Sequence, residues 1–188
     1  YNTCPFSHHC ATTVGVAPGT GAMRRGTALH KALEARLKND RGAVDLAGVD
    51  TDDIRFVEAG IERLFKWECP GKIVGIELPL SMETGQYTIV GRLDALIEMP
   101  DGLWSLQLKS LGKGVNPATA MEKVRMSPHE LTYHWLVKHT MGIDIKGTYL
   151  LLLRDLTIKA TKEGTDMLTE VFLPRSSGEV AHAMSQDI

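Results

Sequence analysis

The feature that most constrains the fold of this chain is the turn Met99-Pro100-Asp101-Gly102, because it joins two segments in which apolar and polar residues alternate. Such alternation is the spacing of a β-strand with one buried face, and Pro followed closely by Gly is typical of a β-turn. The segments 87–98 and 103–110 are therefore predicted to be the two antiparallel strands of a hairpin.

The turn also predicts which residues of the hairpin face each other. If its two central residues form the tip, Asp94 lies opposite Gln107 and Arg92 lies opposite Lys109. Alternate residues of a strand point to the same side, so Asp94, Gln107 and Lys109 are expected to share one face of the hairpin. A shift of one residue would turn the partner strand over, so this expectation depends on the length of the turn.

Residue patterns typical of α-helices precede and follow the hairpin in the sequence. Apolar residues three or four positions apart predict amphipathic helices over 22–39 and 52–68. After the hairpin, Ser127 is expected to cap a further helix, and Glu130 to complete a capping box with it. That helix is predicted to end at Gly142.

Further strands complete the expected sheet. The segment 74–80 alternates, with its apolar residues on one side and Glu77 on the other. The segment 148–153 is apolar on both faces, which is typical of a central strand, and 156–161 with 166–173 are expected to form an edge hairpin. This order of elements predicts an α/β fold in which a central mixed β-sheet is flanked by α-helices.

Length and composition indicate one domain over 1–188, with an irregular lead-in over 1–21 and a tail over 174–188. The 21 Lys+Arg and 23 Asp+Glu residues give a net charge of −2, which excludes a generally basic nucleic-acid binder but not a local basic groove. No apolar run reaches the roughly 18 residues of a membrane span. Three cysteines cannot all pair, and reduced thiols predict a cytoplasmic protein, of a bacterium or of the host cell if the protein is viral.

The sequence offers one set of side chains suited to metal-assisted hydrolysis, namely His30, Glu77, Asp94, Gln107 and Lys109. A carboxylate such as Asp94 binds Mg²⁺ or Mn²⁺ through hard oxygen ligands, and the backbone carbonyl of Leu108 can add another. The ion activates a water and neutralises the scissile phosphate, while Lys109 orients that water or stabilises the developing charge. Each residue also has an ordinary structural explanation, Asp94 as a polar group at a strand end and Lys109 as a solvated charge.

Four short motifs carry a resemblance to a known family: Gly26-Thr-Ala-Leu-His30-Lys-Ala-Leu-Glu34, Glu77-Leu-Pro-Leu80, Gly91-Arg-Leu-Asp94-Ala-Leu96 and Leu106-Gln-Leu-Lys109-Ser110. In this order they resemble the motifs of RecB-like PD-(D/E)XK nucleases, which include the nuclease domains of recombinational repair helicases and the CRISPR-associated exonucleases. Cys4-Pro5-Phe6 is similar to the Cys-Pro-aromatic opening often found there, and Tyr133 falls where the family has a helix tyrosine. The similarity covers about residues 4–154.

The resemblance implies a restriction-endonuclease-like fold and a deoxyribonuclease that depends on Mg²⁺ or Mn²⁺. It implies that the metal is held by His30, Asp94, Gln107 and the backbone carbonyl of Leu108. The catalytic residues are then Asp94, Gln107 and Lys109. The residues expected to bind DNA or to support the site are Glu34, Glu77, Arg92, Ser110, Lys113, His129 and Tyr133.

Two residues depart from the family pattern. The family has Asp or Glu where this chain has Gln107, and commonly Gln where this chain has His129. Gln107 keeps an oxygen ligand but loses a charge, which is compatible with a working natural variant, an inactive binding derivative or an engineered change that traps substrate. Relatives with an iron–sulfur cluster carry three cysteines near the C-terminus, whereas no Cys follows Cys69 here, so no such cluster is expected.

The expected function is a metal-dependent DNA nuclease, an exonuclease in DNA repair, recombination or the processing of phage or mobile-element DNA. Single strands or duplex ends are the expected substrates, because no recognition module is visible. The segment 105–125 carries Lys109, Lys113, Lys123 and Arg125, and it can follow a phosphate backbone. A recombination or replication protein is a further expected partner. No interaction with a membrane is expected. The alternative is a catalytically silent DNA-binding or scaffold protein that retains the nuclease fold.

Overall fold

The computed structural model describes residues 20–40, 42, 44–83, 88–125, 127–156, 166–176 and 178. Its helices are α2 (Gly21–Leu37), α3 (Thr51–Lys66), α4 (Pro117–Arg125) and α5 (Pro128–Met141). Its strands are β1 (Lys72–Glu83), β2 (Thr88–Met99), β3 (Gly102–Leu111), β4 (Gly147–Arg154) and β5 (Leu168–Pro174). The predicted α/β class is confirmed.

The strands form one mixed sheet in the order β1-β2-β3-β4-β5. Only β3 and β4 run parallel among these neighbours, because α4 and α5 form the crossover between them. The strand β4 is buried from residue 147 to 153 and has a neighbour on each side, as expected of a central strand. The edge strand β5 pairs antiparallel with β4, whereas residues 157–161 of the other predicted edge strand lie outside the described residues.

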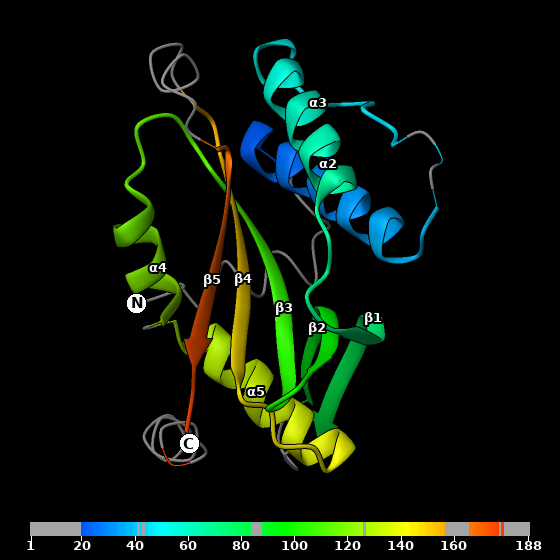
Figure 1. The fold of residues 1–188 in the computed structure, drawn as a ribbon, viewed down its shortest axis with the longest axis vertical. Helices are drawn as coiled ribbons and strands as arrows, with labels where there is room; N and C mark the ends of the chain where they lie inside the picture. The colour runs from blue at the N-terminus through cyan, green and yellow to red at the C-terminus, as the bar shows by residue number, and fades with distance from the viewer. Residues whose placement is uncertain are drawn as a thin grey trace.

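Helices cover both faces of the sheet (Figure 1). The helices α2 and α3 share a buried cluster with Tyr149, Leu151 and Leu153 of β4. The intervening Leu150 and Leu152 face the other way and pack against α4. The helix α5 lies across the lower end of the sheet in this view, where Leu136 and Val137 pack against β2. Within the described residues, no helix is both long and apolar enough to cross a bilayer.

The register predicted from the turn is confirmed over the closed end of the hairpin. Met99 pairs with Gly102, and the pairing continues to Ala95 and Leu106. It ends there, one residue before the expected pair of Asp94 and Gln107. The reason is that the Asp94 carboxylate itself accepts a hydrogen bond from the backbone N–H of Leu108, with Oδ2 at 3.0 Å.

The regular alternation predicted for 74–80 is wrong at two points. Ile76 packs against the core shared with α2 and α3, whereas Leu78 and Leu80 pack with α5 on the other face, and Glu77 with its positive φ lies between them. The alternation also fails at its start. Val74 is 49% exposed, while Ile73 packs against the core shared with α2 and α3. The pairing of β1 with β2 shifts between Ile73 and Gly75, and such a bulge turns the following side chains to the other face.

The predicted capping box of α5 is also wrong, although the predicted end of that helix is correct. Gly142 ends α5 in the left-handed region, with φ of 68°. Ser127 makes no side-chain capping hydrogen bond, and the carboxylate of Glu130 lies 3.6 Å from the ammonium of Lys109 on β3. The inward turn of the Glu130 side chain toward Lys109 takes it away from the backbone N–H of Ser127, which the capping box requires as its partner.

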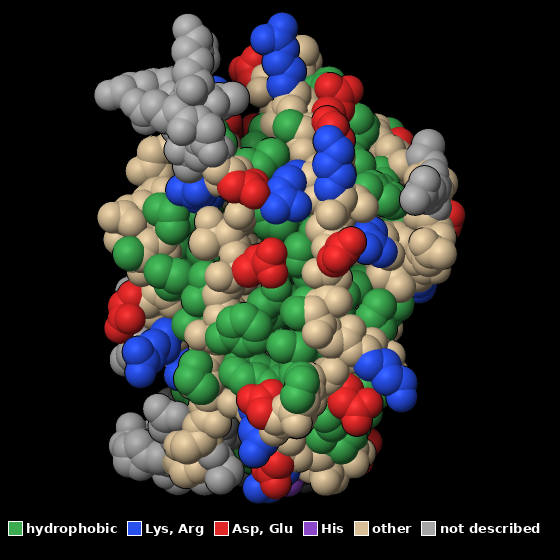
Figure 2. Space-filling view, viewed as in Figure 1, with side chains coloured by type: hydrophobic (Ala, Val, Ile, Leu, Met, Phe, Trp, Pro, Cys, Tyr) green, Lys and Arg blue, Asp and Glu red, His purple; other side chains and the backbone are tan. Residues whose placement is uncertain are grey.

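Among the described helices, none covers the lower part of one sheet face in the view of Figure 1. Figure 2 shows hydrophobic side chains gathered there, over β3, β4 and β5. The edge of Trp104 packs on the ring of Phe172, which also contacts Tyr149, and Phe172 remains 48% exposed. Acidic and basic side chains are intermixed around this patch, so the visible face has no continuous basic strip.

Replacement of Gly60 by Ala is expected to destabilise the packing of α2 on α3. A Cβ at Gly60 would lie 2.8 Å from Cδ2 of Leu29, which is fully buried. Overpacking of this kind costs about 1–3 kcal/mol in the free energy of unfolding. Gly26→Ala in α2 is the matched control, because no atom lies within 4 Å of its Cβ position and the helix gains up to about 1 kcal/mol. The gain from helix propensity applies to Gly60→Ala as well, so Gly60→Ala is expected to be about 1–3 kcal/mol less stable than Gly26→Ala in urea unfolding. Equal stability of these two variants would contradict the described contact.

Candidate functional site

An open cleft of about 520 Å³ lies between α2, β1, β2 and α5. Its lining residues are Met23, Gly26, Thr27, His30, Lys31, Glu34, Glu77, Arg92, Asp94 and Tyr133. The stripe of Gly26, His30 and Glu34 along α2 therefore faces the cleft. The predicted site residues that line it are His30, Glu34, Glu77, Arg92, Asp94 and Tyr133, whereas Gln107, Lys109, Ser110, Lys113 and His129 do not.

Asp94 lies at the centre of the predicted residues. Its Oδ2 is 3.1 Å from Nδ1 of His30 on α2, and the same oxygen accepts the N–H of Leu108 on β3. The side chain is 17% exposed, so it is largely shielded from bulk water but still reachable from the cleft. The structure thus brings together His30 and Asp94, which are far apart in the sequence.

Glu77 reaches the same cleft from an unusual backbone conformation. Its φ is 50°, in the left-handed region that costs a non-glycine residue about 1–3 kcal/mol. Its Oε2 lies 2.9 Å from Nε of Arg92. Burial raises the pKa of Glu77, although the charge of Arg92 opposes this shift. Strain of this kind is found most often at functional sites, where the surrounding structure holds it in place.

Two other acids of the cleft, Glu34 and Glu77, have a basic partner, whereas Asp94 has none among the described Lys and Arg residues. Glu34 pairs with Lys38 at 2.5 Å, and Glu77 pairs with Arg92. Within the described residues, Asp94 has no Lys or Arg partner, and its ion-pair contact is with a histidine that is charged only when protonated. Negative charge therefore remains at Asp94, where a cation is the natural counter-charge.

Tyr133 of α5 forms one wall of the cleft because β2 carries a glycine beside it. A Cβ at Gly91 would lie 2.5 Å from Cε1 of Tyr133, so a larger residue would displace the ring. Burial raises the pKa of the Tyr133 hydroxyl. The ring of His129 packs edge-on at 4.4 Å, and burial together with the charge of Lys109 lowers its pKa, which favours a neutral imidazole.

Gln107 and Lys109 lie beside the cleft rather than in its wall. Gln107 is only 4% exposed, while the side chain of Lys109 is 39% exposed. Lys109 reaches Glu130 on α5, and the negative charge of Asp94 acts on Glu130 as well. Ser110 follows on β3, and Lys113 is exposed in the loop beyond it. Sequence reasoning missed Glu130, because an acid in the first turn of a helix is equally typical of a cap.

The cleft offers a divalent cation few ligands from acids and histidines. Within the described part of the chain, no group of three or more His, Cys, Asp or Glu side chains is arranged to hold a metal ion. Two side chains of these types, those of His30 and Asp94, are in contact with each other. The N–H and C=O of an extended residue point to the same side of its strand, so the Leu108 carbonyl faces Asp94 too. The Asp94 carboxylate and the Leu108 carbonyl are oxygen ligands of the kind that Mg²⁺ and Mn²⁺ take, with water and substrate phosphates as further ligands, whereas the imidazole of His30 is a ligand that transition metals prefer.

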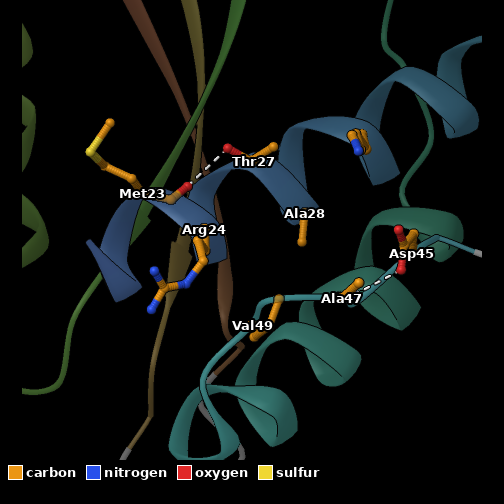
Figure 3. Close-up of a pocket in the computed structure, with 8 residues that line it drawn as sticks. Met23, Arg24, Thr27, Ala28, Asp45, Ala47 and Val49 are labelled. Atoms are coloured by element: carbon orange, nitrogen blue, oxygen red, sulfur yellow. Dashed lines mark hydrogen bonds between the residues drawn. The ribbon is translucent and has the colours of Figure 1, made fainter. Parts of the chain in front are cut away.

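A second hollow of about 200 Å³ lies on the other flank of α2, toward the segment that leads into α3 (Figure 3). It shares Met23, Thr27 and Lys31 with the cleft. Its one acid, Asp45, is engaged by the backbone N–H of Ala47 at 2.8 Å. The second hollow contains no histidine and no second acid, so the cleft at Asp94 is the better candidate for chemistry.

Comparison with known proteins adds little to this description. Neither a family model nor a curated protein matches the chain. Among solved structures, that of SSO0001 matches with 14% identity and a TM-score of 0.35, over 96% of this chain and 81% of that one. A likeness at this TM-score carries no argument about fold or function, so both rest on the residues and geometry described above.

Proposed function

We propose that the protein is a metal-dependent DNA nuclease that acts on single strands or duplex ends, with its active site at Asp94. The observation that carries this proposal is the contact of Asp94 with His30, in a cleft where Asp94 has no Lys or Arg partner among the described residues. The order of the sequence motifs that resemble RecB-like PD-(D/E)XK nucleases supports the same assignment.

Each protein group has a definite task in such a site. A bound Mg²⁺ or Mn²⁺ would neutralise charge on the scissile phosphate. Asp94 and His30 would hold it, with oxygen atoms of Gln107 and Leu108 from the neighbouring strand. Lys109 would donate hydrogen bonds to a water or to a phosphate oxygen as negative charge develops. Arg92 and Lys31, which line the cleft, would attract the DNA backbone.

A second candidate function is a silent DNA-binding protein with a nuclease fold. The buried amide at Gln107 favours it, because that position lacks the negative charge that would help to hold a cation.

A cleavage assay separates the two candidates. The protein is incubated with end-labelled single-stranded DNA, linear duplex and covalently closed circular duplex, each with Mn²⁺, Mg²⁺ or EDTA. The nuclease proposal expects metal-dependent loss of the single-stranded or linear substrate and slower loss of the circle. Binding of DNA without cleavage in any metal would favour the silent protein, and neither binding nor cleavage would contradict both.

Gln107→Glu is expected to lower the Mg²⁺ concentration needed for cleavage. A second carboxylate beside Asp94 attracts a divalent cation, while desolvation and repulsion cancel much of the gain, leaving about 1–3 kcal/mol or about 5- to 150-fold in metal affinity. Gln107→Met is the matched control, since it keeps the volume and removes the oxygen, and it should raise the requirement. Titration of Mg²⁺ against the cleavage rate tests both. If Gln107→Glu needs as much Mg²⁺ as the parent, Gln107 is not at the metal.

A further inference from the structure

Glu130 is a buried acid that the proposed chemistry has not yet used. It is 1% exposed, and its Oε1 lies 3.6 Å from Nζ of Lys109. Its other oxygen, Oε2, is buried without a hydrogen-bond partner among the described residues. Acids are almost never fully buried unless they are paired, so the place of this carboxylate calls for a specific role.

The surroundings of Glu130 identify Lys109 as the group on which it acts. Burial is the main cause that raises the pKa of Glu130, to about 7, and the charge of Lys109 is the largest opposing influence. Asp94 of β2 raises this pKa as well, and Arg175, which follows β5, lowers it. Among these groups, Lys109 is the one for which an ion pair with Glu130 is found.

We propose that Glu130 is a positioning residue that holds the Lys109 ammonium beside Asp94, so that turnover depends on a carboxylate that never touches DNA. This inference rests on the proposed nuclease function. It gives α5 a role in positioning Lys109, which the strand motifs alone do not predict. It also explains why Glu130 is turned inward instead of capping its helix.

The physical reason is preorganisation. A lysine side chain samples many rotamers in water, and only some of them bring the ammonium near the reacting phosphate. A buried anion on α5 restricts that sampling before DNA binds, so less ordering remains to be done in the transition state. The side chain of Lys109 is 39% exposed, so the ion pair with Glu130 does not remove it from solvent.

The first test is kinetic and uses Glu130→Gln, which keeps the shape and removes the charge. Turnover at saturating DNA and Mn²⁺ is expected to fall about 10- to 100-fold, the range for loss of a group that orients a functional residue. The dissociation constant for DNA and the Mn²⁺ requirement are expected to stay within about twofold. Glu58→Gln, an exposed acid on α3, is the matched control and should behave as the parent.

The second test measures melting temperatures in EDTA at pH 8, without DNA or metal. Glu130→Gln is expected to melt at the parent temperature or above, because it removes a buried charge. Lys109→Met leaves that charge without its cation and should melt several degrees lower, roughly 2–4 °C for each kcal/mol lost. The double variant Lys109→Met/Glu130→Gln should recover most of the loss.

The outcomes separate this inference from the proposed function. Additive melting shifts in the double variant would overturn the pairing, whether or not the protein cleaves DNA. Parent-like turnover in Glu130→Gln would overturn the positioning role. A loss of turnover matched by a loss of melting temperature in Glu130→Gln would show a merely structural residue. If the parent binds DNA but cleaves none in any metal, the nuclease proposal fails, while the melting experiment still decides the pairing.

Discussion

Asp94→Asn is expected to reduce metal-dependent cleavage of DNA by at least about 100-fold, because it removes the one acid of the cleft that has no Lys or Arg partner among the described residues. The substituted amide can still accept the N–H of Leu108, so the strand geometry should survive. The same substitution should weaken stabilisation by Mn²⁺. A ligand at about 100 times its dissociation constant adds about 2.7 kcal/mol, or about 5–10 °C in a chain of this size.

Asp45→Asn is the matched control for that experiment. Its carboxylate also accepts one backbone N–H, from Ala47, but it lies in the second hollow, away from His30 and Asp94. It should keep both the cleavage rate and the melting shift with Mn²⁺. Thermal melts with and without Mn²⁺ and initial cleavage rates are compared for the three proteins. An unchanged Mn²⁺ shift in Asp94→Asn and in Asp94→Ala would refute the assignment of the metal to Asp94.

Lys109→Ala is expected to reduce turnover about 100- to 1,000-fold with a much smaller loss of DNA affinity, because its ammonium stabilises charge that develops during the reaction. Lys113 offers the contrast, since it is exposed in the loop after β3. Lys113→Ala should weaken DNA binding and leave turnover nearly intact. The slope of the logarithm of the binding constant against the logarithm of salt concentration should become smaller by about one. Single-turnover rates and binding isotherms at several salt concentrations distinguish these effects. Equal losses in rate and affinity for Lys109→Ala would reduce Lys109 to a phosphate contact.

The parts of the fold that could be predicted from the sequence are those with local causes. The turn before Gly102 determined the register of β2 and β3 as far as Ala95, and Gly142 determined the end of α5. Apolar spacing predicted the helices α2 and α3 to within a few residues. In each case the residues that determine the feature lie within a few positions of it.

The differences from the sequence prediction have tertiary causes. The bulge before Gly75 depends on how β1 fits β2, and an isolated glycine inside the strand pattern is its local signal in the sequence. The backbone of Glu77 adopts positive φ, which propensity would reserve for glycine. Glu130 has a sequence context that suits a cap, and only the position of Lys109 across the fold shows why it turns inward.

Part of the candidate site could also be predicted from the sequence. Motif order singled out His30, Glu77 and Asp94, and all three line one cleft. The side chains of Gln107 and Lys109 were expected on the same face as Asp94, yet they lie beside the cleft and not in its wall. A long side chain can reach several partners from one strand position, so its destination follows from packing rather than from spacing.

The most direct measurement of the central claim is anomalous scattering from crystals of the protein soaked in Mn²⁺. The proposed site predicts one strong Mn²⁺ peak in coordination contact with a carboxylate oxygen of Asp94 and with the imidazole of His30, and predicts its loss in Asp94→Asn crystals soaked in the same way. A well-diffracting parent crystal with no Mn²⁺ in the cleft, or with Mn²⁺ bound only away from Asp94, would contradict it.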